Sequence, residues 1–155
     1  QALVERMTSL LKTMGRQIIY CGGIGQGTGM KLFINLLLGT LMQCFAEALC
    51  LGKALDLPLR AMLQTVANSA LACPLYAAKG AAISAGDFSK NFSVDLIYKD
   101  LGLILDAAGS KGVPLPVAAA AREAFGRARD RGLGDEDMCS VIKVIESITG
   151  AAVRA

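Results

Sequence analysis

A cluster of glycines precedes a lysine that could do acid–base chemistry. The glycines are Gly22, Gly23, Gly25, Gly27 and Gly29. Lys31 follows them, and Asn35 comes four residues later, a spacing that puts both side chains on one helix face about one turn apart. Apolar neighbours that partly desolvate the lysine would lower the pKa of its ammonium toward a range useful for proton transfer. The segment is a candidate acid–base site whose asparagine amide could hold a ligand oxygen; the alternative is a solvated charge beside a helix contact.

Two phosphate-binding motifs also place glycines before a helix, and neither is present. A Walker A loop requires Gly-Lys followed by Ser or Thr, whereas Lys31 lies between Met30 and Leu32. The dinucleotide fingerprint requires glycines at positions i, i+2 and i+5, and no register of the cluster supplies all three. The loop is therefore predicted to offer a close, side-chain-free approach to a ligand.

A second group of polar residues lies in the segment KDLGLILD, residues 99–106. Asp95 and Lys99 fall on one helical stripe and could form an ordinary ion pair four residues apart. Asp100 points roughly 100° away, toward an apolar side, where a carboxylate needs a partner. Lys31 or a ligand hydroxyl could be that partner, and the alternative is a solvated helix face.

The charge balance argues against a nucleic-acid-binding protein. The 155 residues, enough for one domain, include 16 Lys and Arg against 13 Asp and Glu, for a net charge of +3. A dedicated nucleic-acid binder concentrates more positive charge and interleaves it with aromatic residues, which make up only 5% of this chain. No nucleic-acid partner is expected.

The chain contains no histidine, so the commonest general base and transition-metal ligand is missing. Proton chemistry must use Lys, Tyr, Cys or a carboxylate. The cysteines show no C-x-x-C spacing and are interpreted as small buried thiols in a reducing compartment. They are Cys21, Cys44, Cys50, Cys73 and Cys139. No metal site is expected. The expected location is the cytoplasm, or the mitochondrial matrix in a eukaryote.

The elements that must position these residues are mostly helices. Apolar spacing predicts a helix over 2–14, followed by a short strand over 17–21. The long stretch 28–55 lacks proline and predicts one helix of about 28 residues and about 40 Å. Ser93 is predicted to be the N-cap of a later helix. The remaining helices are predicted over 58–67, 71–84, 94–108, 117–131 and 135–148.

The predicted fold is mainly α, a helical bundle around one long central helix. A single strand cannot satisfy its own backbone, so residues 1–22 are interpreted as the last helix and strand of a sheet-containing domain, and residues 23–155 as an all-helical domain. The run 32–51 is long enough to cross a membrane. Glu47 within it favours instead a central helix buried on nearly all sides, and no membrane partner is expected.

Both polar segments match one family. Residues 22–35 resemble the signature G-x-x-G-x-G-x-x-x-K-x-x-x-N of the β-hydroxyacid dehydrogenases, the 3-hydroxyisobutyrate dehydrogenase family of the 6-phosphogluconate dehydrogenase-like superfamily. Residues 99–106 are similar to its K-D-L-G-x-A-x-D segment, with Ile104 in place of Ala. The resemblance covers nearly the whole chain and implies a C-terminal catalytic and dimerisation domain, with residues 1–22 as the remnant of a truncated Rossmann domain.

The resemblance also implies residue roles. Lys31 would be the general acid/base, and Lys99 would approach the nicotinamide together with Phe92. Substrate-binding residues would be Asn35, Gly25, Gly27, Phe92 and Asp100. The implied cofactor is NAD or NADP, bound mainly by the N-terminal domain, and the implied substrate is a small β-hydroxyacid or semialdehyde. A homodimer or homotetramer is expected.

Two functions remain open at this point. The first is hydride transfer between nicotinamide and a small β-hydroxyacid or semialdehyde, with this fragment inactive when alone. The alternative is a non-enzymatic helical dimerisation module derived from the same fold, in which the glycine loop is only a hinge.

Overall fold

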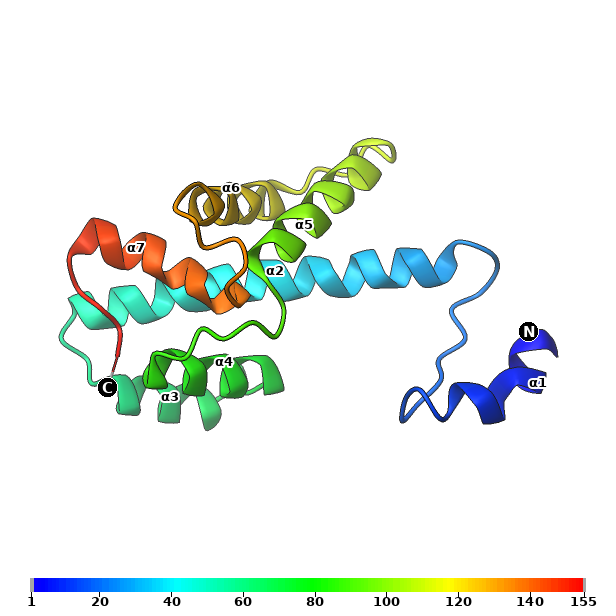
Figure 1. Ribbon diagram of the computed structural model, residues 1–155, viewed down its shortest axis with the longest axis horizontal. Helices are drawn as coiled ribbons and strands as arrows, with labels where there is room; N and C mark the ends of the chain where they lie inside the picture. The colour runs from blue at the N-terminus through cyan, green and yellow to red at the C-terminus, as the bar shows by residue number, and fades with distance from the viewer. Residues whose placement is uncertain (1, 155) are drawn as a thin grey trace. The chain divides into compact units, whose positions relative to one another are not determined.

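The computed structural model describes residues 2–154, and every regular element in that range is helical (Figure 1). The prediction of a mainly α fold with one long helix is confirmed. Each predicted helix lies within three residues of its expected bounds, although the last begins as a 3₁₀ turn. The elements are α1 (Ala2–Leu11), α2 (Gln26–Ala54), α3 (Leu59–Ala67), α4 (Pro74–Ala85), α5 (Val94–Gly109), α6 (Pro116–Asp130), η1 (Met138–Val141) and α7 (Ile142–Thr149).

The chain divides into two compact units, residues 1–34 and 35–155, and the division falls inside α2. The first unit contains α1, a linker and the first turns of α2. The strand predicted over 17–21 is wrong, because these residues join no ladder. A strand is stable only when neighbouring strands complete its backbone hydrogen bonds, and residues 2–154 supply no such neighbour.

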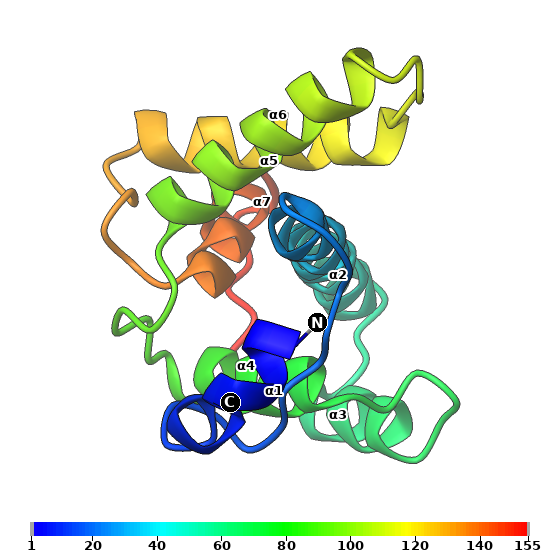
Figure 2. The ribbon, with the colours of Figure 1, turned by 90° about the vertical axis from the view of Figure 1, so that its right-hand side faces the viewer.

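The second unit is built on α2, which Figure 2 shows nearly end-on. The core side of this helix includes Met42, Phe45 and Leu49, which are almost fully buried. The Phe45 ring stacks on Tyr76 of α4 with a centroid distance of 4.4 Å. On α5, Ile97 lies close to the backbone of α2. Helices α4 and α5 therefore both pack on α2.

The prediction that α2 is buried on nearly all sides is wrong. Leu37, Leu41 and Leu51 are exposed by 41%, 37% and 61%, because the other helices of this chain cover only part of its circumference. Within residues 2–154, α2 alone has the length and hydropathy of a membrane span. The core helix of a globular protein meets the same test. The polar side chains of Asn35 and Gln43 are buried in the middle of α2, where a membrane-spanning helix rarely carries polar groups.

The α5–α6 hairpin forms one wall of the unit. Ser93 caps α5 as predicted, and its Oγ accepts a hydrogen bond from the Leu96 N–H at 3.3 Å. Between the two helices, the guanidinium groups of Arg122 and Arg129 lie over the Tyr98 ring, 4.2 and 4.5 Å from its centroid. These cation–π contacts fix the register of α5 against α6.

The prediction that all five cysteines are buried is correct for only two of them. Cys50 and Cys139 are buried, Cys44 is exposed, and Cys21 and Cys73 are partly exposed. The helical period does not distinguish a covered from an uncovered side of α2, and Cys44 lies on the uncovered side. Burial, reinforced by the Glu146 carboxylate, raises the pKa of the Cys50 thiol to about 11. Burial and the Asp137 carboxylate raise the pKa of Cys139 to about 12.

In the folded monomer, Cys44 is therefore expected to react with a maleimide, whereas Cys50 and Cys139 react only after unfolding. At pH 8, a thiol with a pKa near 11 is ionised in about one molecule in a thousand, and the thiolate is the reactive form. Peptide mapping after labelling, with and without denaturant, measures each site. Rapid labelling of Cys139 in the native protein would contradict the burial described here.

Candidate functional site

A buried hydrogen bond joins the two polar segments identified in the sequence. Asn35 of α2 donates from Nδ2 to Oδ2 of Asp100 on α5 at 2.8 Å. Asn35 is 8% exposed and Asp100 is 3% exposed. The carboxylate on the apolar side of α5 thus has the partner that burial requires, and within the second unit that partner is Asn35.

Lys99 supplies the second contact to this carboxylate. Its Nζ lies 3.0 Å from Oδ1 of Asp100, and its side chain remains 56% exposed. The pair between Asp95 and Lys99 suggested by helix spacing is not formed, because Asp95 pairs with Arg129 of α6 instead. The two Asp100 oxygens are therefore held from different directions, and the Asn35 amide is oriented with its carbonyl oxygen turned away from Asp100. That oxygen can accept a hydrogen bond from a ligand hydroxyl.

Gly39 brings α2 and α5 close enough for this contact. A Cβ at Gly39, one turn after Asn35, would lie 3.1 Å from both Ile97 Cδ1 and Leu101 Cδ2. Hydrogen-bond contact between a short amide and a short carboxylate requires such a close approach of the two helix backbones. The residue that sets the helix separation is therefore a neighbour of the polar pair.

Substituting Gly39→Val is expected to destabilise the protein by about 1–3 kcal/mol, because the added side chain overpacks the α2–α5 contact. The matched control is Gly29→Val on the same helix, where a Cβ would meet nothing within 4 Å. That control is expected to change stability by less than about 0.5 kcal/mol. Urea denaturation followed by circular dichroism measures both, and equal effects at the two positions would contradict the close packing at Gly39.

Lys31 lies in the first unit, on the first turns of α2, and its side chain is exposed. The partial desolvation expected from Phe33 and the following leucines is not found, because these neighbours on the same helix leave the Lys31 side chain exposed. The helix runs without interruption from Gln26, so the expected spacing of Lys31 and Asn35, one turn apart on one face, is confirmed.

The glycine loop has the open backbone that the sequence predicts. Gly22 and Gly25 have φ angles of +117° and +90°, which L side chains rarely adopt. A Cβ at Gly25 or Gly27 would meet nothing within 4 Å. Gly25 is thus required by its conformation, whereas Gly27 stands inside the first turn of α2 and leaves its surroundings uncrowded.

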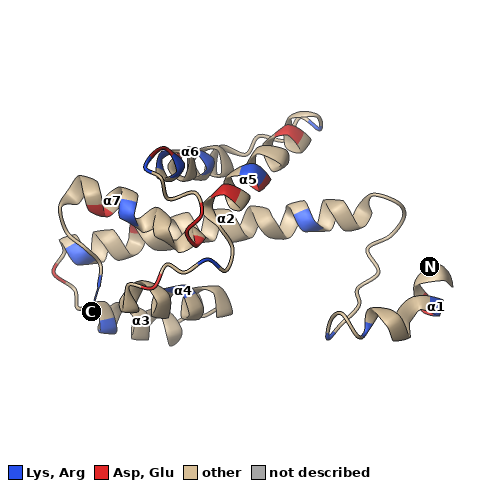
Figure 3. Cartoon of the chain, in the orientation of Figure 1, with Lys and Arg blue, Asp and Glu red and all other residues tan. Residues whose placement is uncertain are grey.

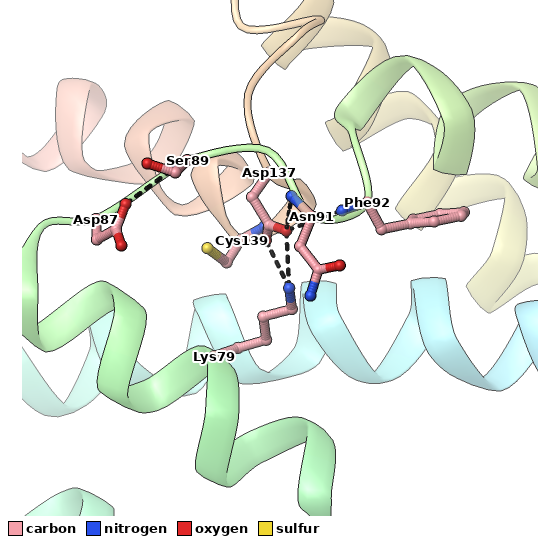
Figure 4. A network of polar contacts seen from close by, with 7 residues as sticks. All are labelled: Lys79, Asp87, Ser89, Asn91, Phe92, Asp137 and Cys139. Atoms are coloured by element: carbon pink, nitrogen blue, oxygen red, sulfur yellow. Dashed lines mark hydrogen bonds and ion pairs between the residues drawn. The ribbon is translucent and has the colours of Figure 1, made fainter.

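Phe92 is positioned by a buried ion pair that sequence analysis did not identify (Figure 4). Lys79 of α4 donates from Nζ to both carboxylate oxygens of Asp137, at 2.9 and 2.8 Å. Asp137 Oδ2 also accepts the N–H of Phe92 at 3.1 Å. The loop before α5, which carries Phe92, is therefore tied to α4 and η1 through one carboxylate.

The charge on Asp137 is stabilised by its donors. Burial on its own would raise the pKa of this carboxyl, but hydrogen bonds from Lys79 and from the N–H groups of Cys139 and Phe92 outweigh burial, so its pKa lies below the ordinary range. The sequence did contain a signal for the pair. Lys79 is the single charged residue of α4, a helix that is mostly tan in Figure 3. A lone cation in an apolar helix needs a partner.

Comparisons with known proteins agree on one family. Residues 25–145, which include Lys31 and the KDLG segment, match the family model described as "NAD-binding of NADP-dependent 3-hydroxyisobutyrate dehydrogenase". A 2-(hydroxymethyl)glutarate dehydrogenase of Eubacterium barkeri is 40% identical over 154 residues, which cover 99% of this chain and 51% of that protein. The chain spans about half the length of the curated relatives it matches.

Solved structures of this family share the fold. A 3-hydroxyisobutyrate dehydrogenase from Salmonella typhimurium superposes with a TM-score of 0.87 at 30% identity, over 93% of this chain and 51% of that one. The Mycobacterium tuberculosis 3-hydroxyisobutyrate dehydrogenase, solved with L-serine, superposes with a TM-score of 0.85 at 26% identity, over 94% and 52% of the two chains. The helical arrangement described above is therefore that of the matching half of these enzymes.

Proposed function

Because the chain belongs to the 3-hydroxyisobutyrate dehydrogenase family of NAD(P)-dependent β-hydroxyacid dehydrogenases, we propose that it is the C-terminal helical half of such an oxidoreductase. Residues 1–22 are the end of a preceding dinucleotide-binding domain, and residues 23–155 form the catalytic and dimerisation domain. One observation carries this proposal: Asn35 and Asp100, 65 residues apart in the two motif segments, meet in a buried hydrogen bond.

Lys31 is the general acid/base in this proposal. During oxidation, its neutral amine takes the proton of the substrate hydroxyl as the carbinol C–H bond breaks; during reduction, its ammonium returns a proton to the carbonyl oxygen. Negative charge on that oxygen is greatest near the transition state, so a nearby cation lowers the barrier more than it stabilises bound substrate. Asn35, oriented by Asp100, holds the reacting group from one turn further along α2.

The described residues fit only the nicotinamide end of NAD(P). The Lys99 ammonium is exposed beside the buried Asn35–Asp100 pair, and Phe92 is a half-buried residue of an anchored loop. When bound, the cofactor accepts or returns the hydride at C4 of its nicotinamide. A strand, glycine-rich turn and helix for the pyrophosphate are not found within residues 2–154.

The substrate class and assembly are extensions of the same proposal. The substrate is a small β-hydroxyacid or semialdehyde. The protein is a homodimer or homotetramer, which the uncovered apolar side of α2 supports. We place it in the cytoplasm, or in the mitochondrial matrix of a eukaryote.

An absorbance assay at the nicotinamide band tests the proposed activity in the enzyme with its dinucleotide-binding half present. NADH and NADPH are each combined with a panel of small semialdehydes, and the reverse reaction is run with the hydroxyacids. Turnover with at least one pair is expected. A helical dimerisation module without catalysis would oxidise neither cofactor with any member of the panel.

This chain alone is expected to bind nucleotide weakly and to show no dehydrogenase activity, because residues 2–154 contain no strand–loop–helix unit that would cradle the pyrophosphate. Isothermal titration calorimetry with NAD and NADP measures the affinity. A micromolar dissociation constant for either nucleotide would mean that the helical half carries most of the cofactor site, contrary to the division of roles proposed here.

A further inference from the structure

The loop between α4 and α5, residues 86–93, is held by the side chain of Asp137, the residue that precedes η1. Asp137 Oδ2 accepts the backbone N–H groups of Asn91 and Phe92 at 3.3 and 3.1 Å (Figure 4). The carbonyl of Phe92 also takes part, because it accepts the Met138 N–H at 2.8 Å. Asp137 and Met138 therefore fix both peptide groups of Phe92; residues 136–141, which contain η1 and the two residues before it, are called the η1 segment below.

Lys79 completes this anchor from α4. Its ammonium contacts both Asp137 oxygens, and the two side chains are 11% and 3% exposed. Hydrogen bonds between ionised partners are shorter and stronger than neutral ones, and burial removes competing water. A neutral side chain at Asp137 would therefore hold the loop more loosely, even where its shape is unchanged.

The anchor also determines where α5 begins. Asp137 donates its own N–H to the Phe88 carbonyl at 3.0 Å, and the carbonyl of the same peptide group, that of Glu136, accepts the Val94 N–H at 3.0 Å. Ser93 then caps the helix that carries Lys99 and Asp100. Displacement of the η1 segment would move the Phe92 ring first and the start of α5 with it.

We propose that Asp137 is a positioning residue of the dehydrogenase, which through the N–H of Phe92 holds the Phe92 ring in the orientation that the nicotinamide cofactor meets. The inference rests on the proposed function, because it assigns Phe92 to the cofactor cleft. It adds to the proposed site a residue that lies outside both motif segments. The buried Lys79–Asp137 pair then has a functional role in addition to stabilising the fold. Because its side chain is only 3% exposed, Asp137 acts in this proposal through Phe92 and not by contact with substrate or cofactor.

A double-mutant cycle in the complete enzyme tests the proposal. Asp137→Asn is expected to raise the KM for NADH or NADPH about tenfold, the size expected for a lost charge-assisted hydrogen bond. Phe92→Ala should raise the same KM. In the Phe92→Ala background, Asp137→Asn should add less than a twofold change, because a residue that acts through Phe92 has nothing left to position.

Glu146→Gln is the matched control. Glu146 is 8% exposed and accepts the Val153 N–H at 2.6 Å, so it is also a buried carboxylate that holds a backbone segment. Among the contacts described, it bonds neither Asn91 nor Phe92, and its ion-pair partner Arg154 lies over Phe88. It is expected to lower stability and leave the cofactor KM within twofold. If the Asp137→Asn variant does not fold, the double variant Lys79→Met/Asp137→Asn is used in its place in the mutant cycle, because it removes both buried charges together.

Amide hydrogen exchange gives a readout that does not depend on turnover. Exchange at Asn91 and Phe92 should accelerate in Asp137→Asn and not in Glu146→Gln, with the opposite result at Val153. An unchanged cofactor KM in Asp137→Asn, or full additivity with Phe92→Ala, overturns the inference while leaving the proposed function intact. Absence of turnover in the unmodified enzyme overturns both, even if the exchange data show that Asp137 holds the loop.

Discussion

Replacement of Lys31 by alanine is expected to lower the turnover of the dehydrogenase by a factor of about 10² to 10⁴, the range that a positioned general acid/base contributes. The loss should appear in kcat with both the hydroxyacid and the carbonyl substrate, since the same group takes and returns the proton. Because the Lys31 side chain is exposed in this chain, the substitution removes no core packing. The urea midpoint should stay unchanged, which separates a catalytic effect from unfolding.

Lys53→Ala provides the control for this prediction. Lys53 is also an exposed lysine of α2, in its last turn. Its removal changes the net charge by the same amount and should leave kcat within twofold. If the Lys31→Ala enzyme keeps turnover within a few-fold of the unmodified enzyme, the assigned role is wrong and another group must move the proton.

Asp137→Asn is expected to destabilise the folded chain by about 3–5 kcal/mol at pH 7, because it leaves the Lys79 ammonium buried without its counter-charge. Urea denaturation measures the difference. The matched control is Asp135→Asn, two residues away. Asp135 pairs with Lys90, but its side chain is 88% exposed, so this exchange should cost less than about 1 kcal/mol. Equal losses at the two positions would contradict the buried charge pair.

The same variant has a defined pH dependence. The pKa of Asp137 is lowered in the folded chain, so its ionised form stabilises the fold at pH values above the ordinary value of about 3.9. That stabilisation is lost as the pH falls through the lowered folded pKa. The stability difference between the unmodified chain and Asp137→Asn should therefore shrink between pH 5 and the acid limit. A difference that stays constant down to pH 3 would show that Asp137 carries no depressed pKa.

Local rules in the sequence account for most of the secondary structure. Hydrophobic spacing and the positions of glycine and proline locate the helices, since these features act within one or two turns of backbone. The Ser93 cap is of the same kind, because its partner lies three residues away. The strand over 17–21 is the exception: its residue types favour a strand, but pairing depends on other segments.

Burial could not be predicted in the same way. The helical period shows that α2 is apolar all round, but not which side of it another element covers. For this reason the exposure of Cys44, the uncovered leucines of α2 and the hydration of Lys31 all differ from the sequence-based expectations. Each depends on a contact that no residue within a few turns can supply.

By itself, the sequence determined the family, the mainly α class and the residues that could do chemistry, because these follow from residue type and short spacing. Only the tertiary structure decided which of them meet. It joined Asn35 to Asp100 across 65 residues, and Lys79 to Asp137 across 58. Contacts at such separations depend on how helices cross, and a single small residue such as Gly39 sets that distance, so they follow from packing rather than from any local pattern.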